Sequence, residues 1–188
     1  ALGRIPEGRI VRRAGAQVGD RIVVTGTIGD ATLGLAVLQQ RLTASHDEPL
    51  IERYRVPQPR CVLARAVRDH ATASMDVSDG LAGDLAKLCN VSGVSAVIET
   101  AKLPLSAPAS ALLDAGMIEI ETLVAGGDDY EILCTMPEAR VASFMAQAEE
   151  AGVAATVIGE VIAGDAPPRF VDAAGRPIEL KRHSYSHF

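Results

Sequence analysis

The sequence is poor in aromatic residues and has no tryptophan. Phe, Trp and Tyr together make up 3% of the 188 residues, although 48% of the residues are hydrophobic. A core built from Ala, Val, Leu and Ile suits helices packed closely on a sheet. A chain of this length is enough for one domain of ordinary size, or at most two small ones, and no internal linker or repeat is visible. We therefore predict one domain over residues 1–188.

Cysteine is also scarce. Cys61, Cys89 and Cys134 are odd in number and form no C-x-x-C pair. This pattern argues against a disulfide framework or a zinc site and favours reduced thiols in a cytoplasmic protein.

Long apolar runs and an excess of positive charge are both missing. No run approaches the roughly 18 apolar residues that a membrane span needs, and no signal-peptide pattern is present. The formal net charge is −6, whereas nucleic acids and anionic membranes bind cationic surfaces. We therefore expect neither a nucleic acid nor a membrane as a partner. Because the chain begins at Ala1 without an initiator Met, we also expect it to be a fragment or a cleaved product.

Strand-like and helix-like segments alternate along the chain, and a hairpin closes it. The β-branched and apolar runs predict strands at Arg21–Thr27, Ser74–Val77, Val94–Thr100, Glu131–Met136 and Ala155–Val161, with a hairpin of Arg169–Val171 and Ile178–Leu180. Helical spacing predicts helices at 31–42, 60–70, 81–89, 108–115 and 138–151, with a further turn at 119–124. The prolines at 49, 57 and 59 predict a loop before the second helix. Because strict βαβ units are absent, the predicted fold class is α+β (or α/β), with a mixed β-sheet flanked by helices.

The clearest local motif is Met75-Asp76-Val77-Ser78-Asp79-Gly80-Leu81. A strand delivers Asp76, the chain turns, and a helix follows with Ser78 as the expected N-cap. Two carboxylates three residues apart, at a turn with free backbone N–H groups, form the hard-oxygen site that Mg²⁺ prefers. A helix cap with two solvated aspartates would produce the same pattern. From the spacing alone, both interpretations stay open.

The second motif is Gly126-Gly127-Asp128-Asp129-Tyr130-Glu131. Two glycines permit a close backbone approach, and three carboxylates in four residues are costly to place together without a purpose. A tight turn into a strand, with the acids pointing to water, is the alternative.

Two weaker features complete the search for a site. Gly26-Thr27-Ile28-Gly29-Asp30 is a glycine-punctuated strand-to-helix turn with Asp30 as a possible cap, but it lacks the Walker lysine, so we interpret it as structural. His183 and His187 in the tail are four residues apart, but no acid accompanies them, so a packed terminal arm is expected.

Taken together, the motifs resemble thiamine-monophosphate kinases over essentially the whole chain. The similar segments are Arg13-Ala14-Gly15-Ala16 with Gly19-Asp20, Val24 to Ala31, Met75 to Leu81, Gly126 to Ile132, and the closing Tyr185-Ser186-His187-Phe188. Two positions depart from the family pattern. Asp128 stands where Glu is usual, and Ser184-Tyr185 stands where Gly-Trp is common.

The resemblance implies a fold like the C-terminal domain of aminoimidazole-ribonucleotide synthetase, whose superfamily also includes selenophosphate synthetase. It implies ATP as co-substrate, thiamine monophosphate as acceptor and Mg²⁺ as cofactor. Asp76 and Asp79 would bind the metal, and Ser78 and Arg13 would contact ATP. Asp128 would contact thiamine monophosphate, and Tyr185 would pack on its rings.

The resemblance also implies that an N-terminal ATP- and metal-binding domain is absent from this chain and that the full-length protein is a homodimer. We therefore expect the 188-residue chain to fold but not to turn over. Two other hypotheses are a superfamily member that uses a different substrate and a non-catalytic ligand-binding module. The presence of both Asp76 and Asp79 argues against the module.

Overall fold

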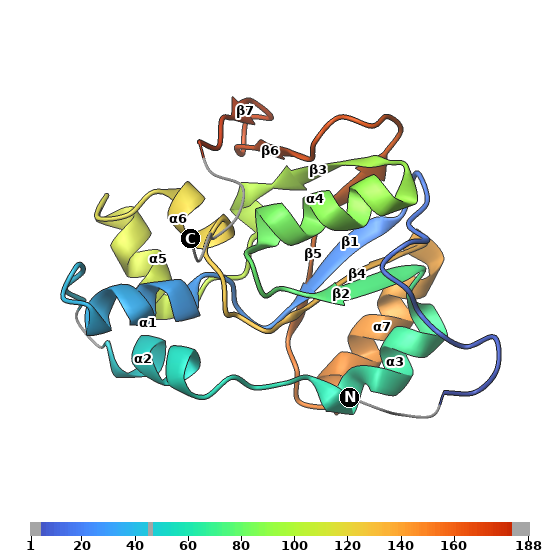
Figure 1. Cartoon of the computed structure of the whole chain (residues 1–188), viewed down its shortest axis with the longest axis horizontal. Coiled ribbons are helices and arrows are strands. Elements are labelled where there is room, and N and C mark those ends of the chain that lie inside the picture. The colour runs from blue at the N-terminus through green and yellow to red at the C-terminus, as the bar shows by residue number, and fades with distance from the viewer. Residues whose placement is uncertain (1–4, 45–46, 182–188) are drawn as a thin grey trace.

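In the computed structural model, which describes residues 5–44 and 47–181, the strands join one sheet in the order β2-β4-β1-β5-β3-β6-β7 (Figure 1). The strands are β1 (Arg21–Thr25), β2 (Ala73–Asp76), β3 (Ser95–Glu99), β4 (Ile132–Met136), β5 (Ala155–Ile162), β6 (Arg169–Val171) and β7 (Pro177–Ile178). Neighbouring strands are antiparallel except for β3 and β6, which are parallel. The predicted mixed sheet is confirmed.

The helices flank this sheet, as the sequence predicted. They are α1 (Asp30–Leu38), α2 (Glu48–Arg55), α3 (Ala64–His70), α4 (Leu81–Ser92), α5 (Ala107–Asp114), α6 (Ile120–Val124) and α7 (Glu138–Glu150). Two short 3₁₀ helices, η1 (Cys61–Leu63) and η2 (Thr100–Lys102), precede α3 and follow β3. No described helix is both long and apolar enough to cross a membrane.

The alternation of side chains along the strands creates two apolar cores. Ile22 and Val24 of β1 pack with Leu85 of α4 on one face of the sheet. Val23 packs with Phe144 of α7 on the other face, where α3 also lies. Successive side chains of a strand point to opposite faces, so one β-branched strand serves both cores.

Helix α2 is the element that the sequence analysis missed. A loop was predicted here because of Pro49, but this proline lies in the first turn of α2, where its missing N–H is not needed. Leu50 is fully buried and belongs to a third apolar cluster with Leu33 of α1. The two helices approach closely, since a Cβ at Gly34 would lie 2.1 Å from the Leu50 carbonyl oxygen.

Two predicted helix caps are wrong. Helix α4 begins at Leu81 with Gly80 as its N-cap, so Ser78 lies outside the helix. The N-cap of α1 is Gly29 in a left-handed conformation, and Asp30 is the first helical residue. The Asp30 carboxylate instead accepts hydrogen bonds from the hydroxyls of Thr27 (2.6 Å) and Ser106 (2.5 Å).

Strand pairing brings the three sequence motifs to one end of the sheet. Strand β4 lies between β2 and β1 and is antiparallel to both. Its first residue, Ile132, pairs with Asp76 at the end of β2, and Leu133 pairs with Val24 near the end of β1. The loops after β1 and β2 and the loop before β4 therefore meet.

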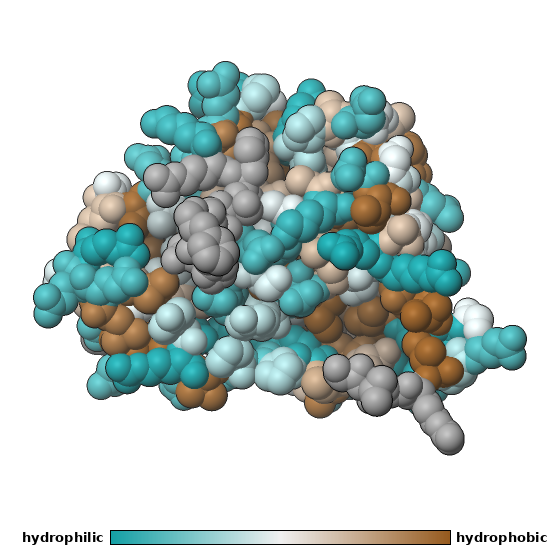
Figure 2. Space-filling model, viewed as in Figure 1, coloured by the Kyte–Doolittle hydropathy of each residue, from teal (hydrophilic) through white to brown (hydrophobic). Residues whose placement is uncertain are grey.

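The N-terminal segment runs along the outer edge of β2. The backbone N–H of Ser74 donates to the carbonyl of Arg12 at 3.0 Å. Ile5, Val11 and Met75 contribute to a cavity of about 570 Å³ on this side. Figure 2 shows a surface on which hydrophilic residues predominate, with apolar residues gathered near the N-terminal end.

Candidate functional site

The loop that carries Asp76 and Asp79 and the loop that precedes β4 are joined by backbone hydrogen bonds. The Asp128 N–H donates to the Ser78 carbonyl at 2.9 Å, and the Tyr130 N–H donates to the Val77 carbonyl at 2.8 Å. The Val77 N–H donates in turn to the Glu131 carbonyl at 2.9 Å. The two strongest sequence motifs therefore form one structural unit.

Glycine is required where these loops touch. A Cβ at Gly127 would lie 2.5 Å from the Ser78 carbonyl oxygen, which is closer than real Cβ contacts allow. Asp128 (φ 70°) and Tyr130 (φ 52°) both adopt a left-handed backbone conformation that costs non-glycine residues energy. Such strain is concentrated at functional sites.

The carboxylates predicted to bind metal and substrate gather around the Tyr130 phenol. Its hydroxyl donates to Oδ1 of Asp128 at 3.2 Å. The negative charge of Asp128 is the main cause that raises the pKa of Tyr130, and Asp76 and Asp79 also contribute. The structure thus brings three of the predicted site residues together, while their roles as ligands stay predictions.

The sequence analysis missed Asp84 and Lys87, which organise the turn. Oδ2 of the buried Asp84 accepts the backbone N–H groups of Ser78 (2.8 Å) and Asp79 (2.9 Å). Lys87 donates from Nζ to the carboxylates of both Asp79 and Asp84. Partial burial opposes the charge on Lys87, but the two carboxylates outweigh it and raise the pKa of Lys87. An acid in the first turn of the following helix was the available signal.

The donor set of this turn fits a magnesium ion that is shared with a phosphate ligand. Asp76 is exposed and Asp79 is partly exposed, so hard oxygen atoms face the solvent. Within residues 5–44 and 47–181, no group of three or more His, Cys, Asp or Glu side chains is arranged to hold a metal ion. Mg²⁺ commonly uses one or two carboxylates and completes its shell with water and substrate phosphate. These residues suit that arrangement and would not enclose an ion by themselves.

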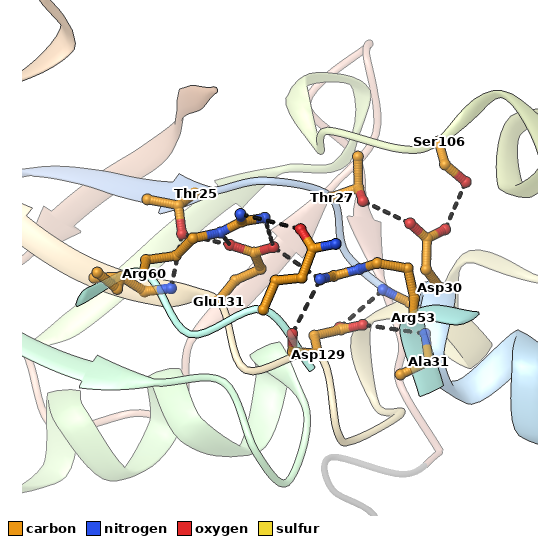
Figure 3. A network of polar contacts seen from close by, with 12 residues as sticks. Thr25, Thr27, Asp30, Ala31, Arg53, Arg60, Ser106, Asp129 and Glu131 are labelled. Atoms are coloured by element: carbon orange, nitrogen blue, oxygen red, sulfur yellow. Dashed lines mark hydrogen bonds and ion pairs between the residues drawn. The ribbon is translucent and has the colours of Figure 1, made fainter. Parts of the chain in front are cut away.

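Asp129 caps helix α1 from about a hundred residues away. Its buried carboxylate accepts the N–H of Gly29 at 2.8 Å and that of Ala31 at 3.4 Å (Figure 3). Burial raises the pKa of Asp129 to about 8, although the two N–H donors act in the opposite direction. The N-terminus of α1 is therefore filled by the chain's own carboxyl group. This agrees with the structural interpretation of the Gly26–Asp30 turn.

Glu131 is the centre of a buried ionic network (Figure 3). Its fully buried carboxylate accepts hydrogen bonds from Arg53 (2.8 Å), from Arg60 (2.6 and 2.8 Å) and from the Thr25 hydroxyl (2.7 Å). Arg53 also donates to the Asp129 carbonyl at 3.1 Å. The alternative in which the acids of this motif point to water is wrong for Asp129 and Glu131. Both acids are buried and hold the loop in place.

Cavities lie on both sides of this loop. Asp128 lines a cavity of about 430 Å³ with Thr32 of α1 and with Glu119 and Glu121 at α6. Tyr130 lines the cavity of about 570 Å³ near β2, to which Asp76 also contributes. Both volumes lie in the usual range for small-molecule sites. The Asp128–Tyr130 hydrogen bond thus connects the walls of two possible ligand sites.

The structure does not bring Arg13 into this group. Arg13 is exposed and follows Arg12, whose carbonyl is bonded to the outer edge of β2. Tyr185 and the histidines of the tail lie outside the described residues. Their predicted roles remain predictions.

Known proteins resemble this chain in both sequence and fold. A thiamine-monophosphate kinase from Caulobacter vibrioides is 39% identical over 99% of this chain and 53% of its own length. The solved thiamine-monophosphate kinase from Stenotrophomonas maltophilia K279a is 34% identical, with a TM-score of 0.79, over 88% of this chain and 54% of its own. The structure of AaThiL complexed with AMPPCP and TMP is also 34% identical, with a TM-score of 0.78, over 96% of this chain and 55% of its own.

The chain therefore spans about half the length of the relatives it matches. Residues 17–171 match the family model described as AIR synthase related protein, C-terminal domain. This match covers all of the sheet except β7. The chain belongs to the AIR synthase related protein family, as a C-terminal domain.

Proposed function

We propose that this chain is the C-terminal domain of a thiamine-monophosphate kinase. The kinase would transfer the γ-phosphoryl group of ATP to the phosphate of thiamine monophosphate, giving thiamine diphosphate and ADP. The observation that carries this proposal is the likeness to AaThiL, which was solved with AMPPCP, an ATP analogue, and TMP. The interlocked loops that bear Asp76, Asp79 and Asp128 support it, because they lie at the junction of two cavities.

The cavity of about 430 Å³ carries charge of both signs, which suits the acceptor. Glu119, Glu121 and Asp128 supply negative charge toward the permanent positive charge of the thiazolium ring of thiamine. Arg41 and Lys181 supply positive charge toward its phosphate. Ala31 and Leu35 of α1 supply apolar surface for the rings. Asp128 would contact the acceptor, and we keep the proposal that Tyr185 packs against it.

The reaction needs little covalent help from the protein. A phosphate monoester is largely ionised near neutral pH, so its oxygen can attack the γ-phosphorus without a general base. The protein's tasks are to position both ligands and to offset their charge. Ser78, which lies in the turn after β2, and Arg13 would contact ATP.

Asp76 and Asp79 would hold Mg²⁺, which when bound supplies positive charge to the polyphosphate. The exposed carboxyl groups at the end of β2 and in the following turn support this assignment. Their interlock with the loop before β4 would fix them relative to Asp128.

The remaining parts of the protein are also proposals. We propose that an N-terminal domain outside the 188 residues completes the metal and nucleotide sites, and that the full-length kinase is a homodimer in the cytoplasm. The three cysteines of the chain are free, which supports a reducing compartment. The isolated chain is then expected to fold but not to form thiamine diphosphate. Light scattering on the full-length protein would test the dimer.

A coupled ATP-consumption assay with thiamine monophosphate and Mg²⁺ tests the function. It compares the full-length kinase with its Asp79→Asn variant, which is expected to lose most of the rate because the carboxylate charge is removed. Product formation by the isolated chain would refute the need for the N-terminal domain. If the full-length protein uses a different acceptor, the substrate assignment is wrong and the family assignment stands.

A further inference from the structure

Lys87 of α4 lies at the turn that carries Asp79, where two carboxylates share its single ammonium group. Nζ donates to Oδ2 of Asp79 and, at 2.9 Å, to Oδ1 of Asp84. We propose, on the basis of the proposed function, that the Lys87 ammonium is the counter-ion of Asp79 and competes with a divalent cation for this carboxylate. In this role, Lys87 sets how tightly the turn binds metal.

The two contacts of Lys87 differ in how easily they break. The Asp84 side chain is 1% exposed, and its other oxygen is already bonded to the backbone N–H groups of Ser78 and Asp79. Asp84 is also three residues before Lys87 on the same helix, so their contact is local. The Asp79 side chain is 44% exposed, and its contact with Lys87 is partly solvated. The ammonium is therefore anchored on Asp84 and exchangeable at Asp79.

Breaking the exchangeable contact leaves no charge buried and unpaired. Lys87 keeps Asp84 as its partner, and Asp79 turns to water or to an incoming cation. The large penalty for separating a buried ion pair therefore does not apply at Asp79. A divalent cation can take this carboxylate without disturbing the hydrogen bonds that Asp84 makes to the turn.

Metal binding nevertheless has to overcome the charge of Lys87. The ammonium beside Asp79 cancels part of the negative potential that would attract a cation, and it repels the cation itself. Because the pair is partly exposed, solvent screening limits the effect to about five- to tenfold in metal affinity. Removing the ammonium is thus expected to tighten binding, whereas an arginine at this position would preserve the competition.

Direct Mn²⁺ binding to the 188-residue chain, measured by the electron paramagnetic resonance of free Mn²⁺ at low ionic strength, tests the proposal. The Lys87→Met and Lys87→Gln variants are expected to bind Mn²⁺ about fivefold more tightly than the wild type. Lys87→Arg is expected to match the wild type. Lys102→Met is the matched control, because it removes the same charge from a surface pair with Glu99, also at i, i+3. Adding Asp79→Asn to Lys87→Met is expected to abolish the gain.

Circular dichroism melts establish that each variant is folded before binding is compared. The proposal is overturned if both neutral variants bind no more tightly than the wild type. It is also overturned if Lys102→Met tightens binding equally, or if none of these chains binds Mn²⁺ in the millimolar range. Because no thiamine phosphate or ATP is present, failure of the kinase assignment leaves this comparison unaffected. Failure of the Mn²⁺ comparison likewise leaves the kinase assignment unaffected.

Discussion

Replacing Asp129 by Asn is expected to change how the stability of the domain depends on pH. In the folded chain, burial raises the pKa of this carboxyl group to about 8 from an ordinary value of 3.8. Between these two values the folded state binds a proton that the unfolded state releases. Stability therefore falls as pH rises through this window, and the loss is complete above the folded pKa.

The size of the loss follows from the shift. About four pKa units at roughly 1.4 kcal/mol each give on the order of 5 kcal/mol in the free energy of unfolding. Local opening of the loop before β4 sets an upper limit, because an open loop would expose the carboxylate to water. An Asn side chain cannot ionise, yet its oxygen can still accept the Gly29 N–H. The free energy of unfolding of the variant is thus expected not to show the fall with rising pH that is expected for the wild type.

Urea unfolding from about pH 5 to about pH 9 measures this difference. Between these two pH values the stability of the wild type is expected to fall by several kcal/mol relative to that of Asp129→Asn, which is about half the calculated loss or more. Asp165→Asn is the control, since it removes the same charge from an exposed loop. Parallel pH profiles for wild type and Asp129→Asn would refute the reasoning, because the buried carboxyl group would then not titrate within this window.

Two further substitutions test the interlocked loops. Glu131→Gln leaves Arg53 and Arg60 without their buried counter-charge and is expected to cost about 3–5 kcal/mol in urea unfolding. The surface control Glu138→Gln, which loses only an exposed pair with Arg21, is expected to cost about 0–1 kcal/mol, and equal losses would contradict the distinction. Gly127→Ala places a Cβ against the Ser78 carbonyl and is expected to lower kcat of the full-length kinase more than tenfold, or by about 1.4 kcal/mol or more in transition-state stabilisation. Gly164→Ala, whose added Cβ would meet nothing within 4 Å but would be strained by a φ of 119°, is the control for backbone strain without a contact. An unchanged kcat in Gly127→Ala would show that the close approach is not needed.

Local patterns predicted most of the elements, because their signals are contained in a few neighbouring residues. The run around Ile22–Val24 is β-branched and ends where Gly26 turns with a positive φ angle of 58°. Helix α7 likewise ends just before Gly152, which has a φ of 69°. Helix α2 has terminal signals, Pro49 in its first turn and Arg53 and Arg55 in its last, but little apolar pattern between them. Its charged residues surround a single buried side chain, Leu50, and its position depends on packing against Gly34 of α1.

The site could be predicted only in part, for a related reason. The motifs identified Asp76, Asp79 and Asp128, because each stands in a short run of acids and glycine that is visible in the sequence. That the two runs meet in space depends on the strand pairing. The partners of the buried acids come from distant segments. Asp129 binds the backbone at Gly29, and Glu131 binds side chains of the segment from 53 to 60. The spacing of residues in the sequence cannot reveal such pairs. The sequence therefore shows where the acids are but not which of them are buried.

The position of the N-terminal segment has a consequence for self-association. An uncovered sheet edge offers free N–H and C=O groups to another chain, and natural proteins shield such edges or keep them short. Here β7, at one edge, has only two residues, and β2, at the other, is bonded through Ser74 to Arg12. The residues before β1 thus cover the outer edge of β2. A version of the protein trimmed up to Ala16 would present β2 as a template for intermolecular strand pairing and aggregation.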